Sequence, residues 1–400
     1  MVWKKCRLRD IGAPQNGISK GNEFFGQGFP FLSYMDVYNN AVTPQKVNGL
    51  IQSNESERNC YSVKEGDIFF TRTSETIDEV GLTSVCLKTI PEATFAGFLI
   101  RVRPFSKKLL SNFAKYYFRS HYVRSYLEKE MDIVTRASLG QDVLKGMPVL
   151  LPPQDVQQKI ADFLDAKTQN IDKRFKILQK KKEHYITLRK AIINETVNGE
   201  GRDWMPCRLK DLVFNLVESG KRPVEIEEDV VSIGGEHIQN EKFYLENLKY
   251  VSFSTFKKSK GKIEIGDILV VKDGATIGKC MYVSDMPFEK MLLNEHVYRI
   301  QSNKKCNNKF LFYFILSNGD FWFRLNNMTT AQETIKLDTI YTMKINLPNL
   351  KEQDKIANYL DKKTSAIDSI VEKITKEIDA LKIYRRALIN EAVTGKLNIG

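Results

Sequence analysis

LPPQDVQQKIADFLDAKTQNID, from Leu151 to Asp172, occurs again as LPNLKEQDKIANYLDKKTSAID, from Leu347 to Asp368, and this pair of stretches decides the fold. The two copies align without a gap at an offset of 196 residues. The match resumes downstream, where LRKAIINETVNGE from Leu188 corresponds to YRRALINEAVTGK from Tyr384. So many identities at one offset are typical of an internal duplication.

The segments that precede these stretches correspond more loosely. WKKCRLRDI from Trp3 is like WMPCRLKDL from Trp204, and GDIFFTRTSETI from Gly66 is like GDILVVKDGATI from Gly266. The small drift in offset indicates loop insertions within a shared scaffold. The predicted order is domain, helix, domain, helix, with boundaries at 1–151, 152–200, 201–347 and 348–400.

Each repeated stretch predicts one long helix. Pro152 and Pro153 precede the first helix, Asp155 is its predicted N-cap, and Gly199 is its predicted stop. From Asp155 to Val197 such a helix would be about 65 Å long, at about 1.5 Å per residue. Apolar residues recur every three or four positions in both stretches, which is typical of a coiled coil.

The positions predicted to pack in this coiled coil or against a partner are Ile160, Leu164, Ile171, Phe175, Leu178, Leu188, Ile192, Ile356, Leu360, Ile367, Ile374, Ile378, Leu381 and Leu388. Because neither apolar stripe can be buried alone, we expect the helices to pair antiparallel about a pseudo-twofold axis. The alternative is that each helix lies on its own neighbouring domain.

The two domains between the helices are expected to mix strands and helices. Short β-branched or aromatic runs predict strands at 67–71, 96–102, 267–271 and 297–300, and helical patterns lie at 111–130 and 308–316. Gly66-Asp67 and Gly266-Asp267 are predicted turns that begin a strand. The predicted fold class is α+β, with two such domains related by pseudo-twofold symmetry and separated by the antiparallel coiled coil.

Composition and charge narrow the class of protein. The 400 residues are 42% hydrophobic and 28% charged, which argues against a disordered or fibrous chain. A formal net charge of +12 suits a polyanionic partner, although a merely basic protein is an equal alternative. We see no signal peptide and no apolar run long enough for a membrane span. The six scattered cysteines predict reduced thiols and a cytoplasmic location.

Motifs for catalysis are missing from the sequence. We find no phosphate-binding loop, no Asn-Pro-Pro-aromatic methyltransferase tetrapeptide, no G-x-G-x-x-G and no Cys/His spacing for zinc. Glu264, Asp267 and Lys272 are a possible nuclease set, but the first half has Lys64 where a duplicated site would keep its carboxylate. We therefore predict no catalytic and no metal-binding residue.

Basic and amide side chains interleaved with aromatics predict a DNA-binding surface in each domain. Arg and Lys can donate to guanine, Asn and Gln can pair with adenine, and further cations neutralise phosphates. The predicted DNA-binding residues are Lys20, Tyr34, Asp36, Asn39, Arg72, Ser74 and Arg136 in the first domain, and Lys221, Arg222, His237, Gln239, Lys272, Thr276 and Gln332 in the second. The alternative for any single one is a solvated surface residue.

The arrangement of the segments suits a two-part DNA target better than any single residue does. Two divergent domains are joined by nearly constant helices. A span of about 65 Å is about two turns of duplex, so two readers could meet the major groove on one face, with unread base pairs between them.

Taken together, these motifs resemble the specificity subunit of type I restriction-modification enzymes. The resemblance rests on the two stretches from Leu151 and Leu347 and on the endings RKAIINETVNG from Arg189 and RRALINEAVTG from Arg385. RLKDL and GDIL add weaker support, and the likeness covers the whole chain. The first copy departs from the usual pattern by having Val156 where the second has Glu352.

The resemblance implies a non-catalytic subunit with two target-recognition domains, each reading one half of an asymmetric double-stranded DNA site. It implies helices that set the spacer and dock two modification (methyltransferase) subunits, which restriction subunits then join. No cofactor is expected in this chain; S-adenosylmethionine, ATP and magnesium would belong to the partners. The alternatives are a self-contained nuclease or methyltransferase, and an adaptor whose coiled coil only scaffolds other proteins.

Overall fold

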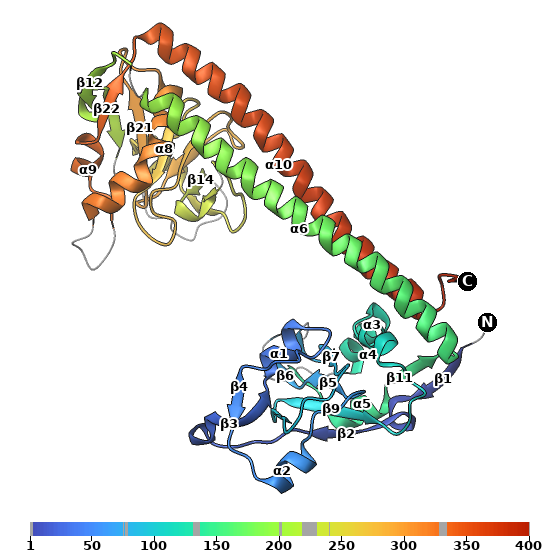
Figure 1. Ribbon diagram of the computed structural model, residues 1–400. Coiled ribbons are helices and arrows are strands. Elements are labelled where there is room, and N and C mark those ends of the chain that lie inside the picture. The colour runs from blue at the N-terminus through green and yellow to red at the C-terminus, as the bar shows by residue number, and fades with distance from the viewer. Residues whose placement is uncertain are drawn as a thin grey trace. The chain divides into compact units, whose positions relative to one another are not determined.

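A computed structural model of the chain describes residues 3–74, 76, 79–130, 137–199, 202–217, 230–239, 241–327 and 334–399. The chain divides into two compact units (Figure 1). Unit 1 is Met1–Gln179 with Lys376–Gly400, and unit 2 is Lys180–Thr375. Each unit contains one mixed domain together with part of each long helix.

The two predicted long helices are confirmed. α6 spans Gln154–Asn198 and α10 spans Leu350–Val393, with 45 and 44 residues. The predicted N-cap is wrong by two positions: Asp155 lies in the first turn, because the Pro153 carbonyl already accepts the Gln157 amide at 2.9 Å. The predicted stop is confirmed at Gly199, whose φ of +56° is a left-handed conformation that favours glycine.

The long helices contact each other and the domains, so the two arrangements expected from the sequence are both present. In unit 1, Ile160 and Leu164 of α6 share one core with Leu388 and Ile389 of α10. In unit 2 the roles are exchanged, and Ile356 and Leu360 of α10 share a core with Ile193 and Val197 of α6. The start of one helix meets the end of the other in each unit, which is the pattern of an antiparallel pair.

The predicted packing stripe is largely buried. Leu188 is 37% exposed, and Ile193, which was not predicted, is 2% exposed. A straight helix drifts relative to a strict seven-residue repeat, so the buried face moves by one position over a helix of this length.

The domain of unit 1 is built on an antiparallel four-stranded sheet in the order β2-β9-β5-β7. A three-stranded sheet, β4-β3-β8, and a pair, β1-β11, complete it, and β6 pairs with β10. The strands are β1 (Lys4–Arg7), β2 (Gly12–Asn16), β3 (Phe25–Leu32), β4 (Gly49–Ile51), β5 (Ile68–Thr71), β6 (Thr73–Ser74), β7 (Thr83–Val85), β8 (Thr94–Phe95), β9 (Leu99–Pro104), β10 (Ala137–Ser138) and β11 (Pro148–Leu151). The helices are α1 (Tyr34–Asn39), α2 (Glu55–Cys60), α3 (Ser111–Tyr117), α4 (His121–Glu130) and α5 (Gln141–Gly146).

The domain of unit 2 repeats the four-stranded sheet, the three-stranded sheet and the pair next to the long helix, but not the small β6–β10 pair. Its sheets run β13-β21-β18-β19 and β17-β14-β20, its pair is β12-β22, and β15 pairs with β16. The strands are β12 (Met205–Arg208), β13 (Val213–Val217), β14 (Val230–Ile233), β15 (Ile238–Gln239), β16 (Lys242–Phe243), β17 (Lys249–Val251), β18 (Ile268–Val271), β19 (Cys280–Tyr282), β20 (Met291–Leu293), β21 (Val297–Ser302) and β22 (Lys344–Leu347). The helices are α7 (Phe253–Lys258), α8 (Asn308–Asn327) and α9 (Leu337–Tyr341).

The turns predicted to begin the central strands are confirmed. Gly66 and Gly266 have φ angles of +89° and +95°. Asp67 and Asp267, which follow them, are fully buried, and each accepts the backbone amide three residues upstream at 2.7 Å. The sequence Gly-Asp thus closes a tight turn and directs β5 or β18 into the core.

Among the helices that the structure describes, none is long and apolar enough to cross a membrane.

Candidate functional site

The candidate site in each unit lies where the central strand ends. After β5, the Arg72 amide donates to the Phe98 carbonyl at 2.9 Å, and the Arg72 carbonyl accepts the Leu139 amide at 2.8 Å. After β18, the Lys272 amide donates to the His296 carbonyl at 3.0 Å, and the Lys272 carbonyl accepts the Ile335 amide at 2.8 Å. Two predicted DNA-binding cations therefore occupy equivalent places, each half-buried at the edge of its domain.

In unit 1 a cluster of hydroxyl groups and one carboxylate includes Ser74, two residues after Arg72. Ser74 donates to Glu79 through its hydroxyl, and Tyr38 donates to the same carboxylate at 2.9 Å. The hydrogen bond from Ser74 and, to a smaller extent, the one from Tyr38 lower the pKa of Glu79. The same bond to Glu79 raises the pKa of Tyr38. Tyr34 stacks on Tyr38 with 6.0 Å between ring centroids.

In unit 2 the side chains around Lys272 are different. His296 places Nδ1 2.6 Å from an Asp273 oxygen and Nε2 3.6 Å from a Glu295 oxygen. The Thr276 hydroxyl donates to the Gly235 carbonyl at 3.1 Å, and the Lys272 ammonium lies 5.6 Å from the centre of the Tyr298 ring. At the equivalent place unit 1 presents Phe98, whose side chain is 65% exposed.

Two predicted DNA-binding residues, Asp36 and His237, close equivalent turns inside the domains. The Ser33 amide donates to an Asp36 oxygen at 2.9 Å, and the Gly234 amide donates to His237 Nδ1 at 2.9 Å. His237 is 1% exposed. Both side chains thus satisfy the backbone at the start of a helical turn, three residues after the residue whose amide they accept.

The other predicted residues lie in varied surroundings. Lys20 forms an ion pair with Glu57 at 2.7 Å, Gln239 donates to the Glu236 carbonyl at 3.1 Å, and Asn39 is exposed. Four of the predicted residues lie outside the described part of the chain and stay predictions: Arg136, Lys221, Arg222 and Gln332.

Sequence reasoning missed several residues that the structure brings to these sites, namely Glu79 and Phe98 in unit 1 and Asp273, Glu295 and His296 in unit 2. Phe98 and His296 immediately precede β9 and β21, whose strand patterns were recognised. The available signal was their place within or directly before a predicted strand, but the pairing of these positions with the end of β5 or β18 is a long-range contact.

One of the two carboxylates considered for a nuclease, that of Asp267, is engaged in the fold. Asp267 accepts the Glu264 amide at 2.7 Å and the Gln301 side chain at 2.6 Å, and burial raises its pKa. Over the described residues, no group of three or more His, Cys, Asp or Glu side chains could hold a metal ion.

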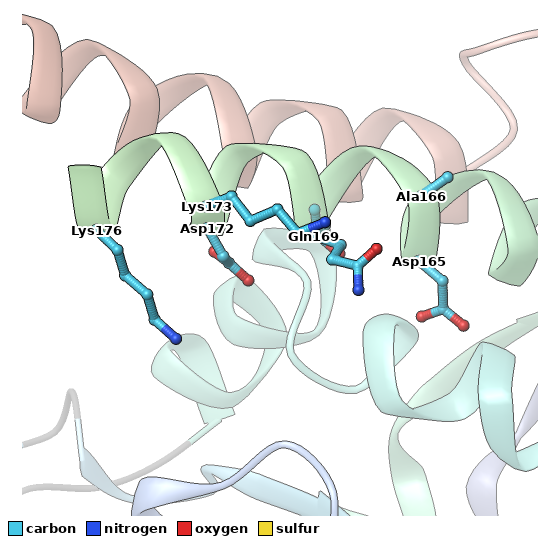
Figure 2. Close-up of a pocket in the computed structure, with 7 residues that line it drawn as sticks. Asp165, Ala166, Gln169, Asp172, Lys173 and Lys176 are labelled. Atoms are coloured by element: carbon cyan, nitrogen blue, oxygen red, sulfur yellow. The ribbon is translucent and has the colours of Figure 1, made fainter. Parts of the chain in front are cut away.

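An open groove of about 600 Å³ runs along α6 in unit 1 (Figure 2). It is lined by Asp165, Ala166, Thr168, Gln169, Asp172, Lys173 and Lys176. Its two carboxylates are already paired, Asp165 with Lys115 at 2.7 Å and Asp172 with Arg385 at 3.1 Å. The groove therefore presents structural ion pairs rather than a free pair of acids for catalysis.

Comparisons with known proteins agree on one family. The model of the family described as "Type I restriction modification DNA specificity domain" matches residues 2–184 and again 201–380. The chain is 23% identical to a putative type I restriction enzyme MjaX specificity subunit of Methanocaldococcus jannaschii, over 99% of this chain and 94% of that protein. It is 28% identical to the EcoKI specificity subunit of Escherichia coli, over 40% of this chain and 34% of that protein.

Solved structures show the same fold. A chain from work on complex assembly and conformational transition of a type I R-M system superposes with a TM-score of 0.78, at 14% identity, over 99% of this chain and 98% of that chain. The HsdS subunit from Thermoanaerobacter tengcongensis gives a TM-score of 0.57, also at 14% identity, over 99% and 97%.

Proposed function

The chain belongs to the type I restriction-modification DNA specificity family, and we propose that it selects the DNA sequence on which a methyltransferase and endonuclease complex acts. In this proposal each unit's domain reads one half of a split, asymmetric site in double-stranded DNA. The long helices hold the two readers and dock two methyltransferase subunits, which the restriction subunits then join.

The observation that carries the proposal is that the two units share their helix contacts but differ in the polar residues at the ends of their central strands. Arg189 pairs with Asp368 at 2.9 Å in unit 2, and Arg385 pairs with Asp172 at 3.1 Å in unit 1, so the same two positions of the repeat contact each other with the copies exchanged. At the strand ends, by contrast, Arg72 beside Phe98 is replaced by Lys272 beside His296. Two readers with one scaffold and different polar groups suit two different half-sites.

Two equivalent exposed positions on the helices support docking of two copies of one partner. Leu188 of α6 and Tyr384 of α10 occupy the same position of the repeat, and they are 37% and 54% exposed. Ile383, next to Tyr384, is 67% exposed. Apolar side chains repeated on two related surfaces can seat two identical subunits.

In this proposal the chain itself performs no catalysis. Its carboxylates at the repeated turns and along the groove of α6 serve ion pairs and backbone hydrogen bonds. S-adenosylmethionine, ATP and magnesium would be bound by the methyltransferase and restriction subunits. Because methylation of an adenine within a duplex requires the base to leave the stack, that step would also belong to the methyltransferase.

The proposal is tested by mapping methylated adenines in cells that carry the cognate methyltransferase subunits, with and without this chain. We expect methylation at one split sequence only when the chain is present. The purified chain, given S-adenosylmethionine or magnesium, should neither methylate nor cleave DNA. Activity of the purified chain would favour a self-contained enzyme, and methylation that does not depend on the chain would favour an adaptor.

The spacer role of the helices has its own test. Deleting about seven residues from α6 near Lys180 and from α10 near Lys376 shortens each helix by about 10 Å. We expect the unread spacer to shorten by about three base pairs, with both half-sites unchanged. An unaltered spacer in the methylation map would contradict a spacing role.

A further inference from the structure

Unit 2 carries a lysine cluster on α7 and the loop that follows it. The segment 252–265, SFSTFKKSKGKIEI, contains Lys257, Lys258, Lys260 and Lys262 with a single acid, Glu264. The corresponding segment of unit 1, 52–65, reads QSNESERNCYSVKE and contains three glutamates, one arginine and one lysine. Both segments contain one short helix and end at the turn that begins the central strand, so the fold is shared while the charge is reversed.

The lysine cluster is organised around two aromatic rings. Phe253 and Phe256 stack with 6.1 Å between ring centroids and 17° between planes. The Lys257 ammonium lies 4.7 Å from the centre of the Phe253 ring, and that of Lys262 lies 5.2 Å from the centre of the Phe256 ring. Phe256 packs inward against Val230, Val251 and Leu292. The rings therefore fix the lysine stems on a rigid base.

The charge of the lysine cluster is not cancelled within the described part of unit 2. Over those residues, no carboxylate forms an ion pair with any of its four lysines, and Lys257, Lys258 and Lys260 are exposed. In the corresponding region of unit 1, Arg58 pairs with Glu92 at 3.7 Å, and Glu57 pairs with Lys20 of a neighbouring loop at 2.7 Å. The asymmetry points to an anionic ligand for unit 2 alone.

We propose that the lysine cluster binds backbone phosphates of the DNA duplex held by unit 2, an anchor that unit 1 lacks. This inference rests on the proposed function. Lysine ammonium groups on flexible stems neutralise phosphates without reading bases, because they offer no fixed fork to a base edge. A protein partner is disfavoured, since lysine is depleted at protein–protein interfaces.

Counterion release sets how much the lysine cluster should add to the salt dependence of DNA binding. Each phosphate contact contributes about 0.9 to the slope of log K against log salt concentration. Four lysines at four phosphates would therefore contribute a slope of about 3 to 4. The contribution would be the same for any duplex sequence, because phosphates are common to all.

The experiment compares the full chain with its Lys257→Gln, Lys258→Gln, Lys260→Gln, Lys262→Gln variant, by titration with a duplex of arbitrary sequence at several salt concentrations. We expect the slope to fall by about 3, with sequence preference retained. A matched control removes four exposed lysines elsewhere in unit 2, at Lys304, Lys305, Lys362 and Lys363, and should keep the slope. The corresponding Lys→Arg variant of the lysine cluster should keep it too.

A variant in unit 1 tests whether added lysines in the equivalent segment create new phosphate contacts. Glu55→Lys with Asn59→Lys places two cations on the exposed face of α2 without touching the ion pair of Glu57, and should raise the slope. If the glutamine variant fails to fold, this variant still tests the proposal. An unchanged slope would contradict the assignment of this part of the domains to backbone phosphates.

The outcomes separate the two claims. If the unaltered chain binds no duplex, the proposed function fails. If it binds and the glutamine variant shows the same slope, only the lysine anchor is overturned. Loss of selectivity at one half-site with an unchanged slope would make these lysines base readers. If the glutamine variant binds DNA normally but no longer associates with a restriction subunit, the cluster is a protein-docking surface. Each of these last two results would overturn the proposed phosphate anchor.

Discussion

The contacts between domain and helix are the same in unit 1 and unit 2, whereas the polar groups at the ends of the central strands differ. Tyr116 donates to Asp165 at 2.6 Å in unit 1, and Tyr313 donates to Asp361 at 2.8 Å in unit 2. Lys115 and Lys309 come from different helical positions, yet each reaches the same carboxylate of its unit, at 2.7 Å and 2.6 Å. What is retained is the charge at that place rather than the residue that supplies it.

The difference between the units is greatest at exposed positions. The segment around α2 is acidic and internally paired, and the segment around α7 is basic. Phe98 in unit 1 stands where His296 stands in unit 2. In the proposed function this combination would suit two unlike half-sites, with the scaffold setting position and the exposed groups setting sequence.

The largest expected effect comes from the buried glutamine that each unit uses to join helix and domain. Gln157 accepts the Leu110 amide and donates to the Lys108 and Pro152 carbonyls, and Gln353 repeats these contacts in unit 2. Alanine at either position would leave buried backbone groups unpaired, at a cost of about 3 kcal/mol of unfolding free energy.

We expect Gln157→Ala and Gln353→Ala to destabilise their own units by similar amounts, measured by hydrogen exchange of the amides in each unit. A large loss in one unit with none in the other would break the equivalence of the two scaffolds.

A smaller effect is expected at the buried aspartates that begin the central strands. Arg103 holds Asp67 through two hydrogen bonds of 2.7 Å, whereas Gln301 holds Asp267 through one of 2.6 Å. Arg103→Gln should destabilise unit 1 by about 2 kcal/mol, because a buried carboxylate loses its charged partner. Thermal unfolding monitored separately in each unit measures this, and an unchanged unit 1 would contradict the role of the ion pair.

The buried aspartate of unit 2 predicts a pH dependence of stability. Burial raises the pKa of Asp267 above its ordinary value of 3.8, so the folded state of unit 2 binds this proton more readily than the unfolded state. The stabilisation from the protonated form is complete below pH 3.8 and is lost as the pH rises through the raised value. Asp267→Asn should remove this component from the pH profile of unit 2 unfolding. A profile identical to that of the unaltered chain would show that Asp267 does not titrate in this range.

The smallest effect is expected at the reciprocal ion pairs between the helices. Arg189 is 16% exposed and also binds Glu241 at 2.8 Å, whereas Arg385 is 38% exposed and pairs with Asp172. Arg385→Ala should cost about 0.5 kcal/mol or less, as is usual for exposed pairs. Arg189→Ala should cost more, and a double-mutant cycle with Asp368→Ala separates the pair from the contact with Glu241. If both substitutions lowered the unfolding free energy equally, the additional contact of Arg189 with Glu241 would make no difference between the units.

The long helices could be predicted from the sequence because their signal is local. Repeated apolar spacing and the glycine stop placed α6 within two residues of its observed ends. The Gly-Asp turns were recognised for the same reason. The burial of Ile193 was not predicted, since the buried face of a straight helix drifts slowly against a seven-residue repeat.

The candidate DNA-binding residues were harder to judge from the sequence, because a polar side chain can pair with the backbone as well as bind a ligand. Asp36 and His237 look like base readers in sequence, yet they close equivalent turns, and Lys20 is held by Glu57. Arg72 and Lys272 occupy equivalent places because each follows a recognisable strand, and their DNA-binding role stays a prediction. Phe98 and His296 depend on the register between distant strands, which composition and spacing do not contain.

The most direct test of the proposed function exchanges the domain of one unit and keeps both long helices. The domain of unit 2, residues 202–347, is replaced by the matching domain of a relative with a different target, while α6 and α10 are kept. Methylated adenines are then mapped in cells with the cognate methyltransferase subunits. We expect one half of the methylated sequence to change, with the other half and the spacer retained. A map in which both halves stay the same would contradict the assignment of sequence choice to these domains.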